Sequence, residues 1–246
     1  LGYGQLEDNY FQSSVIDFDK DRSDRSTYKL LGGSIGFYGS TLNTRQYATK
    51  GYLEKLIAQV FTGRERFEPG NPQEGYSPSP QERPSWLQIS YMKEAYHTMG
   101  PKFTLGWMAE ALYSSKNFSE NYTATMMQAG EFAPTPHSKL MYNEAFRANQ
   151  YVAAGIKPIY VLNDMFQFRT EFYGFTPIFP IKKNALNKAY YGKAFSRFEY
   201  MGEVSVICHL PFGAISAYVN HYSSPRREWN VGMTIGWQLF NYRFVE

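Results

Sequence analysis

The sequence Trp-Asn-Val-Gly-Met-Thr-Ile-Gly-Trp-Gln-Leu, residues 229–239, alternates without a break between large apolar side chains and polar or glycine positions. Successive side chains of a β-strand point to opposite faces, so this stretch predicts a strand with one apolar and one polar face. Trp229 and Trp237 lie near the two ends of the apolar face, where aromatic side chains would meet the surfaces of a bilayer. The pattern is typical of a transmembrane β-strand of roughly 9–11 residues.

The composition fits the same interpretation. Of the 246 residues, 18 % are aromatic, with 21 Tyr and 19 Phe, and amphipathic rings are favoured at membrane interfaces. The mean hydropathy is −0.47, and no apolar run approaches the ~18 residues of a membrane helix. A barrel keeps its average hydropathy low because half of each strand faces the lumen. The alternative is a soluble, Tyr-rich β-protein that binds a small apolar ligand.

Several other classes of function find little support. The net charge is +3 without a basic run or an RNA-binding motif, so we expect no nucleic-acid partner. The single cysteine, Cys208, excludes an intramolecular disulfide. Residues 17–21 space three Asp like a calcium loop but lack its glycine and closing glutamate. The four histidines show no metal-ligand spacing, so we expect no metal and no cofactor.

Alternating segments recur along the chain and predict an all-β fold, a transmembrane antiparallel β-barrel of about 12 strands, within a range of roughly 10–16. Residues 1–27 are expected to form a lead-in strand and a charged loop, and residues 28–246 the barrel. Because no signal-like segment follows Leu1, we expect an exported protein to have been processed or to continue upstream. One strand is expected within residues 5–17, and the other expected strands are 29–41, 52–62, 85–97, 103–115, 122–133, 138–145, 160–175, 188–200, 203–211, 214–222 and 229–240.

The connections between these strands predict which ends lie together. Counted back from a periplasmic C-terminus, one side holds mostly short turns and the other side longer loops, as in outer-membrane barrels. The long connection 176–187 falls on the short-turn side and is an exception. The expected short turns are 43–51, 99–102, 134–138 and 211–213, and the longer loops include 64–84 and 223–228.

Two further segments, together with the last strand, carry a family resemblance. Residues 38–51 read Tyr-Gly-Ser-Thr-Leu-Asn-Thr-Arg-Gln-Tyr-Ala-Thr-Lys-Gly, and residues 142–151 read Tyr-Asn-Glu-Ala-Phe-Arg-Ala-Asn-Gln-Tyr. They resemble an early turn and the lumen loop of the BamA, TamA and FhaC-type outer-membrane barrels, the bacterial surface antigen superfamily. Five expected strands follow the second segment, as in that superfamily.

The resemblance also has departures. Asn43 stands where the family's turn has Asp, and Ala48 stands where it has Pro. In the loop, Ala148 replaces a Gly, and the aromatic residue is displaced to Tyr151. The family's usual strand count is higher than 12. The sequence of residues 149–153 is most similar to that of the C-terminal barrel of bacterial patatin-like phospholipases.

The resemblance implies a lumen loop held by a latch. Arg147 would enter the lumen and pair with a carboxylate on the inner wall, where a guanidinium can bind bidentately. Glu171 and Glu199 are the expected partners, and Asn149 and Tyr151 belong to the same latch. The alternative is an ordinary exposed loop arginine. Trp107, Trp229 and Trp237 are the expected membrane-interface aromatics.

The function implied is to anchor, and as a further option to translocate or display, an N-terminal partner domain in the bacterial outer membrane. That domain would be a patatin-like lipase located before Leu1. The expected partners are the lipid bilayer and the barrel-assembly machinery, with a homodimer as an open alternative. A passive pore and a BamA- or TamA-like insertion or secretion barrel are the other functions considered.

No catalysis is expected from these 246 residues. Residues 32–36 match the G-x-S-x-G pattern of a nucleophile elbow, which requires a helix directly after the serine. Here the sequence continues as a glycine-rich strand, so Ser34 is expected to be a lumen-facing strand residue. Residues 220–224 contain Asn, His and Ser at a strand end, without the pattern of a Ser–His phospholipase.

Overall fold

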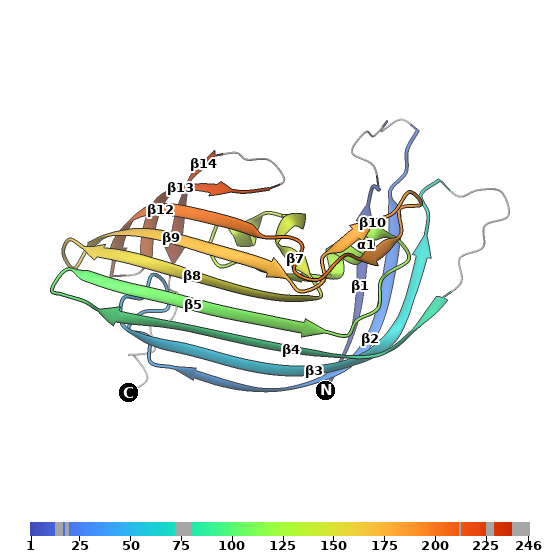
Figure 1. Ribbon diagram of the computed structural model, residues 1–246, viewed down its shortest axis with the longest axis horizontal. Helices are drawn as coiled ribbons and strands as arrows, with labels where there is room; N and C mark the ends of the chain where they lie inside the picture. Colours follow the sequence, from blue (N-terminus) through green and yellow to red (C-terminus); the bar gives the residue numbers. More distant parts are fainter. Residues whose placement is uncertain (13–16, 18–19, 72–79, 212, 225–228, 238–246) are drawn as a thin grey trace.

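Ten antiparallel strands form one continuous sheet, in the order β1-β2-β3-β4-β5-β8-β9-β12-β13-β14. The computed structural model describes residues 1–12, 17, 20–71, 80–211, 213–224 and 229–237. The sheet curls around a chain segment that carries a short helix (Figure 1). Its strands are β1 (Gly2–Tyr10), β2 (Asp24–Ser40), β3 (Gly51–Glu68), β4 (Pro80–Thr98), β5 (Phe103–Ser114), β8 (Gln150–Val161), β9 (Phe166–Pro177), β12 (Glu199–Leu210), β13 (Gly213–Tyr222) and β14 (Trp229–Trp237).

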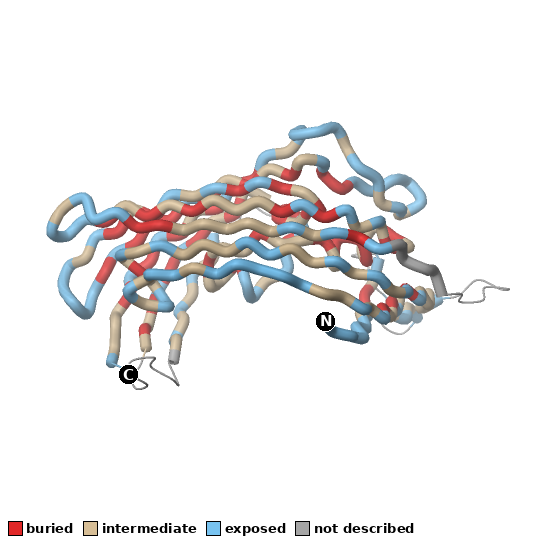
Figure 2. Tube along the Cα trace, turned by 90° about the horizontal axis from the view of Figure 1, so that it is seen from below, coloured by how far each residue is buried: buried red, intermediate tan, exposed pale blue. Residues whose placement is uncertain are grey.

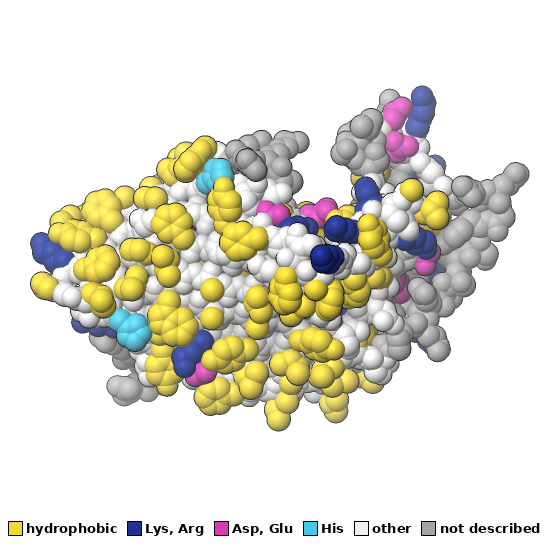
Figure 3. Space-filling model, in the orientation of Figure 1, with side chains coloured by type: hydrophobic (Ala, Val, Ile, Leu, Met, Phe, Trp, Pro, Cys, Tyr) yellow, Lys and Arg dark blue, Asp and Glu magenta, His cyan; other side chains and the backbone are white. Residues whose placement is uncertain are grey.

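The two faces of the sheet have opposite polarity, and the polar face is the buried one. On β9, Phe168 and Phe172 are exposed on the outside, whereas Arg169 and Glu171 between them are buried on the inside. Buried and exposed positions alternate in this way along the strands (Figure 2). Apolar side chains cover most of the sheet face turned to the viewer in Figure 3. On β9, the alternation predicted from the sequence therefore places the charges inside and the large apolar side chains outside.

The connections between neighbouring strands differ at the two ends of the sheet. One end, the short-turn end, carries connections of ten residues or fewer: 41–50, 99–102, 162–165 and 211–212. The opposite end, the long-connection end, carries 11–23, 69–79, 115–149, 178–198 and 223–228. The long connection expected at 176–187 was an exception to the predicted arrangement. In the structure it corresponds to 178–198 and lies at the long-connection end, so the exception disappears. The prediction misplaced it because it counted a strand at 188–200 in addition to 203–211, where the large sheet has only β12.

Residues 115–149, here called the inner segment, lie against the concave face of the sheet. The prediction of strands at 122–133 and 138–145, with a turn at 134–138, was wrong. The segment contains α1 (Tyr122–Gln128), β6 (Gly130–Glu131), the 3-10 helices η1 (Ser138–Leu140) and η2 (Glu144–Phe146), and β7 (Arg147–Ala148). Asn121 caps α1, because its side chain accepts a hydrogen bond from the backbone N–H of Ala124.

Two other predicted strands were also wrong. Residues 160–175 are not one strand, because Asn163 accepts hydrogen bonds from the backbone N–H groups of Met165 and Phe166 and turns the chain between β8 and β9. Residues 188–200 hold only the short β11 (Ala189–Tyr191), which pairs with β10 (Ile181–Lys183), and the first residues of β12. The large sheet therefore has ten strands, fewer than the expected 12 but within the expected range of roughly 10–16, and five of them follow Arg147.

In the part of the chain that the structure describes, no helix combines the length and the apolar character needed to cross a bilayer.

Candidate functional site

The concave face of the sheet is filled by the inner segment. Phe132 and Phe146 of this segment are fully buried against strand residues, with their rings 5.9 and 5.7 Å from that of Phe175 on β9. The ring of Phe132 also lies 6.3 Å from that of Tyr151 on β8. Aromatic pairs at these distances add to the free energy of burial. The inner segment is therefore packed in place, as the prediction of an inward-folded loop requires.

Arg147 joins two parts of the inner segment to each other. Its Nη2 donates a hydrogen bond to Glu131 at 2.7 Å, and its Nη1 donates to the carbonyl oxygens of Met127 and Ala129 at 3.0 and 3.3 Å. The guanidinium also lies 4.7 Å from the centre of the Tyr142 ring. Burial raises the pKa of Tyr142 to about 12, so this phenol stays neutral beside the arginine.

The expected partners of Arg147 were wrong. Glu171 binds Arg169 instead, at 2.9 Å, and Glu199 accepts a hydrogen bond from Ser223 at 2.5 Å. The cause is local geometry, because β6 and β7 form a small antiparallel pair in which Glu131 stands directly opposite Arg147. The nearest carboxylate therefore belongs to the inner segment and not to the wall.

Tyr151 links the sheet to the inner segment, and Asn149 links the inner segment to β11. The Tyr151 hydroxyl donates to Glu110 on β5 at 2.5 Å and lies 3.1 Å from the backbone carbonyl of Glu131. Asn149 donates to the carbonyl of Lys116 at 3.3 Å and to the Tyr191 hydroxyl at 3.0 Å. The latch thus has two parts, an arginine within the inner segment and a tyrosine of the wall that reaches the inner segment.

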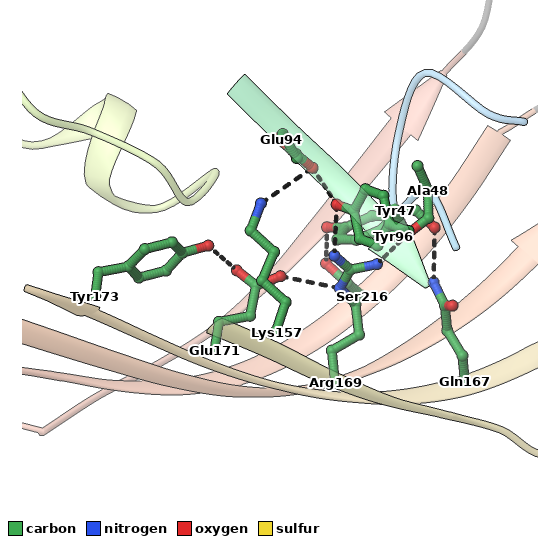
Figure 4. A network of polar contacts seen from close by, with 10 residues as sticks. All are labelled: Tyr47, Ala48, Glu94, Tyr96, Lys157, Gln167, Arg169, Glu171, Tyr173 and Ser216. Carbon is green, nitrogen blue, oxygen red and sulfur yellow. Dashed lines mark hydrogen bonds and ion pairs between the residues drawn. The ribbon is translucent and has the colours of Figure 1, made fainter. Parts of the chain in front are cut away.

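Near the short-turn end, charged side chains form a network inside the sheet (Figure 4). Arg169 donates to Glu171 at 2.9 Å and to the Tyr96 hydroxyl at 3.2 Å, and Tyr173 donates to Glu171 at 2.5 Å. Lys157 on β8 forms an ion pair with a glutamate of β4 at 3.1 Å. Buried charges require partners of this kind, because removal from water is otherwise costly.

The loop 41–50 closes over this network. Arg169 donates from Nη1 to the carbonyl of Ala48 at 2.9 Å, and Gln167 donates to the carbonyl of Tyr47 at 3.2 Å. The Tyr47 hydroxyl bonds that of Ser216 on β13 at 2.6 Å. The loop joins the early part of the sheet to β9 and β13, which Figure 4 shows from close by.

The sequence interpretation did not select Arg169 or Lys157. Arg169 could have been identified from its position in the alternating pattern, because it lies between the outward Phe166, Phe168 and Phe172 on the same strand. A charge in the polar phase of a strand with an exposed apolar phase faces the interior. For Lys157 that signal is weak, because small residues and a proline surround it on β8.

The expected interface aromatics have different surroundings. Trp229 is exposed on the outer face at the long-connection end. Trp107 is partly exposed and donates from Nε1 to Nε2 of His97 at 3.3 Å, on the outer face near the short-turn end. The side chain of Trp237 lies outside the described residues.

The remaining candidates for chemistry are dispersed. Ser34 lies within β2, far from the start of any helix, so the elbow geometry does not form. His137 of the inner segment bonds the Tyr222 hydroxyl through Nδ1 at 2.8 Å, and burial lowers the pKa of His137. Among the described residues, no three His, Cys, Asp or Glu side chains come together as metal ligands.

No protein-family model matches the chain, and no curated protein and no solved structure is similar to it. What is established is an all-β chain whose ten-stranded antiparallel sheet is compatible with a β-barrel.

Proposed function

We propose that this chain is a transmembrane β-barrel of the bacterial outer membrane, and that it anchors a partner domain joined to its N-terminal side. The observation that supports the proposal best is the inverted polarity of the sheet. Phe168 and Phe172 are 45 and 54 % exposed, whereas Arg169 and Glu171 are 2 and 7 % exposed on the same strand. Water disfavours such an arrangement, and a lipid exterior with a polar interior favours it.

Strand number and direction support closure of the sheet into a barrel. The sheet has ten strands, all pairs are antiparallel, and its edge strands β1 and β14 therefore run in opposite directions. An even number of antiparallel strands can close on itself and satisfy the backbone hydrogen bonds of both edges within lipid. Under the proposal, the short turns face the periplasm and the long connections face the outside.

The filled interior favours an anchor over a passive pore. The inner segment packs Phe132 and Phe146 against the sheet, and the loop 41–50 covers the short-turn end. A pore instead needs a continuous water-filled path. The resemblance to BamA, TamA and FhaC-type barrels, and to the barrel of patatin-like phospholipases, supports an N-terminal partner domain and is itself part of the proposal.

A substitution at the centre of β12 tests membrane insertion. Val204 faces outward and is exposed, so Val204→Lys would leave a soluble protein folded and equally soluble. On the lipid face of a barrel, a lysine at mid-depth costs roughly 2–4 kcal/mol. We therefore expect Val204→Lys to reduce heat-modifiable protein in the outer-membrane fraction, whereas the matched control Val204→Ala accumulates normally. Equal accumulation of both variants, or wild-type protein that stays in solution without detergent, would refute the barrel.

The anchoring role needs separate measurements. A reporter enzyme fused before Leu1 is expected to remain with the outer membrane after a carbonate wash, and to be released when the barrel is absent. In planar bilayers, the protein is expected to give no steady conductance. A stable ohmic channel in the wild-type protein would instead support the passive pore.

A further inference from the structure

The connection between β9 and β12 is the most basic stretch of the chain. Residues 178–198 contain five basic and no acidic residues, namely Lys182, Lys183, Lys188, Lys193 and Arg197. The same stretch exposes Leu186, Phe195 and Phe198. Lysines beside exposed aromatic and aliphatic side chains are typical of a segment at a bilayer surface. In Figure 3, Lys and Arg side chains gather beside apolar ones around the position of β10.

Three of these five cations are already engaged with the rest of the protein, and the Nζ of Lys183 lies 5.8 Å from the centre of the Tyr122 ring. Lys188 pairs with Glu120 at 2.5 Å, and Arg197 donates to the carbonyl of Ala145. Lys182 and Lys193 are exposed, and neither forms an ion pair with a residue that the structure describes. The stem of Lys182 packs close to Gly192, which places the two lysines in neighbouring parts of the connection. They remain available to an external anion.

An apolar groove lies on the outer face directly next to this connection. Its volume is about 440 Å³, within the roughly 300–1,000 Å³ of sites that hold small molecules. Small residues form its floor, because Ala154 on β8 pairs with Gly174 on β9. Its sides are formed by Ile156, Phe172, Phe198 and Tyr200. The ring of Phe198 lies over Gly174, and Phe198 is also the last residue of the basic connection.

We propose that the groove and the basic connection form one binding site for a phosphorylated, anionic lipid. An acyl chain lies in the groove, and the phosphate is bound by Lys182 and Lys193 at the long-connection end. This inference rests on the proposed function, because only a membrane-embedded sheet presents its outer face to lipid. Charge complementarity selects the occupant, since a neutral lipid would leave Lys182 and Lys193 without a counter-charge.

A second copy of the chain fits the groove less well. A two-fold interface places the same patch of both subunits together. Two basic connections, each without an acidic residue, would then face each other and repel. An anionic lipid avoids that repulsion and contributes apolar surface that the groove can bury.

Native mass spectrometry of the protein in dodecyl maltoside tests the site, with phosphatidylglycerol and phosphatidylcholine as probes. We expect the wild-type protein to retain phosphatidylglycerol in preference to phosphatidylcholine. Lys182→Gln/Lys193→Gln should reduce this preference by about fivefold for each lysine removed. The control Lys50→Gln/Lys102→Gln, at the short-turn end, should leave it unchanged.

A larger side chain placed in the groove tests whether the groove binds the acyl chain. Ala154→Leu should reduce retention of both lipids, whereas Ala111→Leu, also outward on the neighbouring β5, should not. Inorganic phosphate at the same concentration should fail to displace phosphatidylglycerol, because it has no acyl chain. Equal retention of the two lipids, displacement by free phosphate, equal losses in the control variants or a dimer held through this face would each overturn the inference. Heat-modifiability of the same samples keeps the barrel proposal separate, since a folded barrel without lipid preference contradicts only the lipid site.

Discussion

Arg169 on β9 and Ala48 in the loop between β2 and β3 are joined by a hydrogen bond of 2.9 Å, from Nη1 to the backbone carbonyl. The guanidinium is almost fully buried and also binds Glu171. One side chain therefore holds the loop, the wall and a buried carboxylate together. Its removal should release the loop and leave a buried negative charge without its cation.

For Arg169→Met we expect a loss of about 3–5 kcal/mol in the free energy of unfolding, as for the breaking of other buried ion pairs. Heat-modifiability on gels and urea unfolding measure the loss. Arg169→Met/Glu171→Gln should recover part of it, because the unpaired charge is then gone. Lys102→Met, at an exposed lysine of the short-turn end, is the control. An unchanged unfolding midpoint for Arg169→Met would show that the network does not hold the loop.

Arg147→Ala should loosen the inner segment. The charged hydrogen bond to Glu131 is partly buried, and bonds of this kind contribute about 1.5–3 kcal/mol. We expect a lower unfolding temperature and faster protease cleavage between residues 115 and 149. A double-mutant cycle with Glu131→Gln should show coupling of the two residues, whereas Lys139→Ala in the same segment should behave as wild type. Coupling with Glu171→Gln instead would restore the wall partner expected from the sequence.

For an ion pair on the outer face, we expect replacement of both charged residues by apolar ones to be tolerated better than replacement of one. Glu54 on β3 and Lys93 on β4 stand directly opposite each other, 3.6 Å apart, and Tyr91 donates to Glu54 at 2.7 Å. Lys93→Met alone leaves a carboxylate toward lipid without its cation, so urea unfolding in vesicles should occur at lower concentration. Glu54→Leu/Lys93→Met should restore the midpoint, because an apolar pair suits that face. A double variant less stable than Lys93→Met would contradict a lipid-facing position.

His137 predicts how stability changes in mild acid. Burial lowers the pKa of His137 below its ordinary value of 6.5. As the pH falls below about 6.5, the unfolded chain takes up a proton that the folded chain refuses, so stability decreases until the lower folded pKa is reached. His137→Gln should make the change of the unfolding temperature between about pH 7.5 and 5.5 less steep. An unchanged slope in His137→Gln would exclude His137 as the cause.

Strands with large outward side chains were predictable from the sequence. The alternation of Phe166, Phe168 and Phe172 with polar residues places β9, and the terminal alternation places β14. In contrast, β8 was missed because Ala153, Ala154 and Gly155 give almost no contrast between its faces. A strand is recognised in a sequence by the difference in size and polarity between alternate side chains, and small residues such as Ala and Gly reduce that difference.

The inner segment was harder to predict for two physical reasons. Tyr122, Ala124 and Met126 alternate like a strand, but Asn121 before them is a helix cap, and this signal was not used. The ion partner of Arg147 depends on the β6–β7 pairing, which brings Glu131 opposite it. Such a pairing between short segments of irregular chain has no periodicity in the sequence. The inward folding of the segment that carries Arg147 was therefore predictable, but its pairing with Glu131 was not.

The order of strands has a consequence for how the chain folds. Each strand of the large sheet pairs with the next large-sheet strand along the sequence, so the sheet can grow hairpin by hairpin. The bonds from Tyr47 to Ser216 and from Ala48 to Arg169 span 169 and 121 residues. Contacts of such sequence separation form late, because loop-closure entropy opposes them until the intervening strands are paired. We therefore expect residues 41–50 to close the short-turn end late in folding, and until then the charged interior stays open to water at that end.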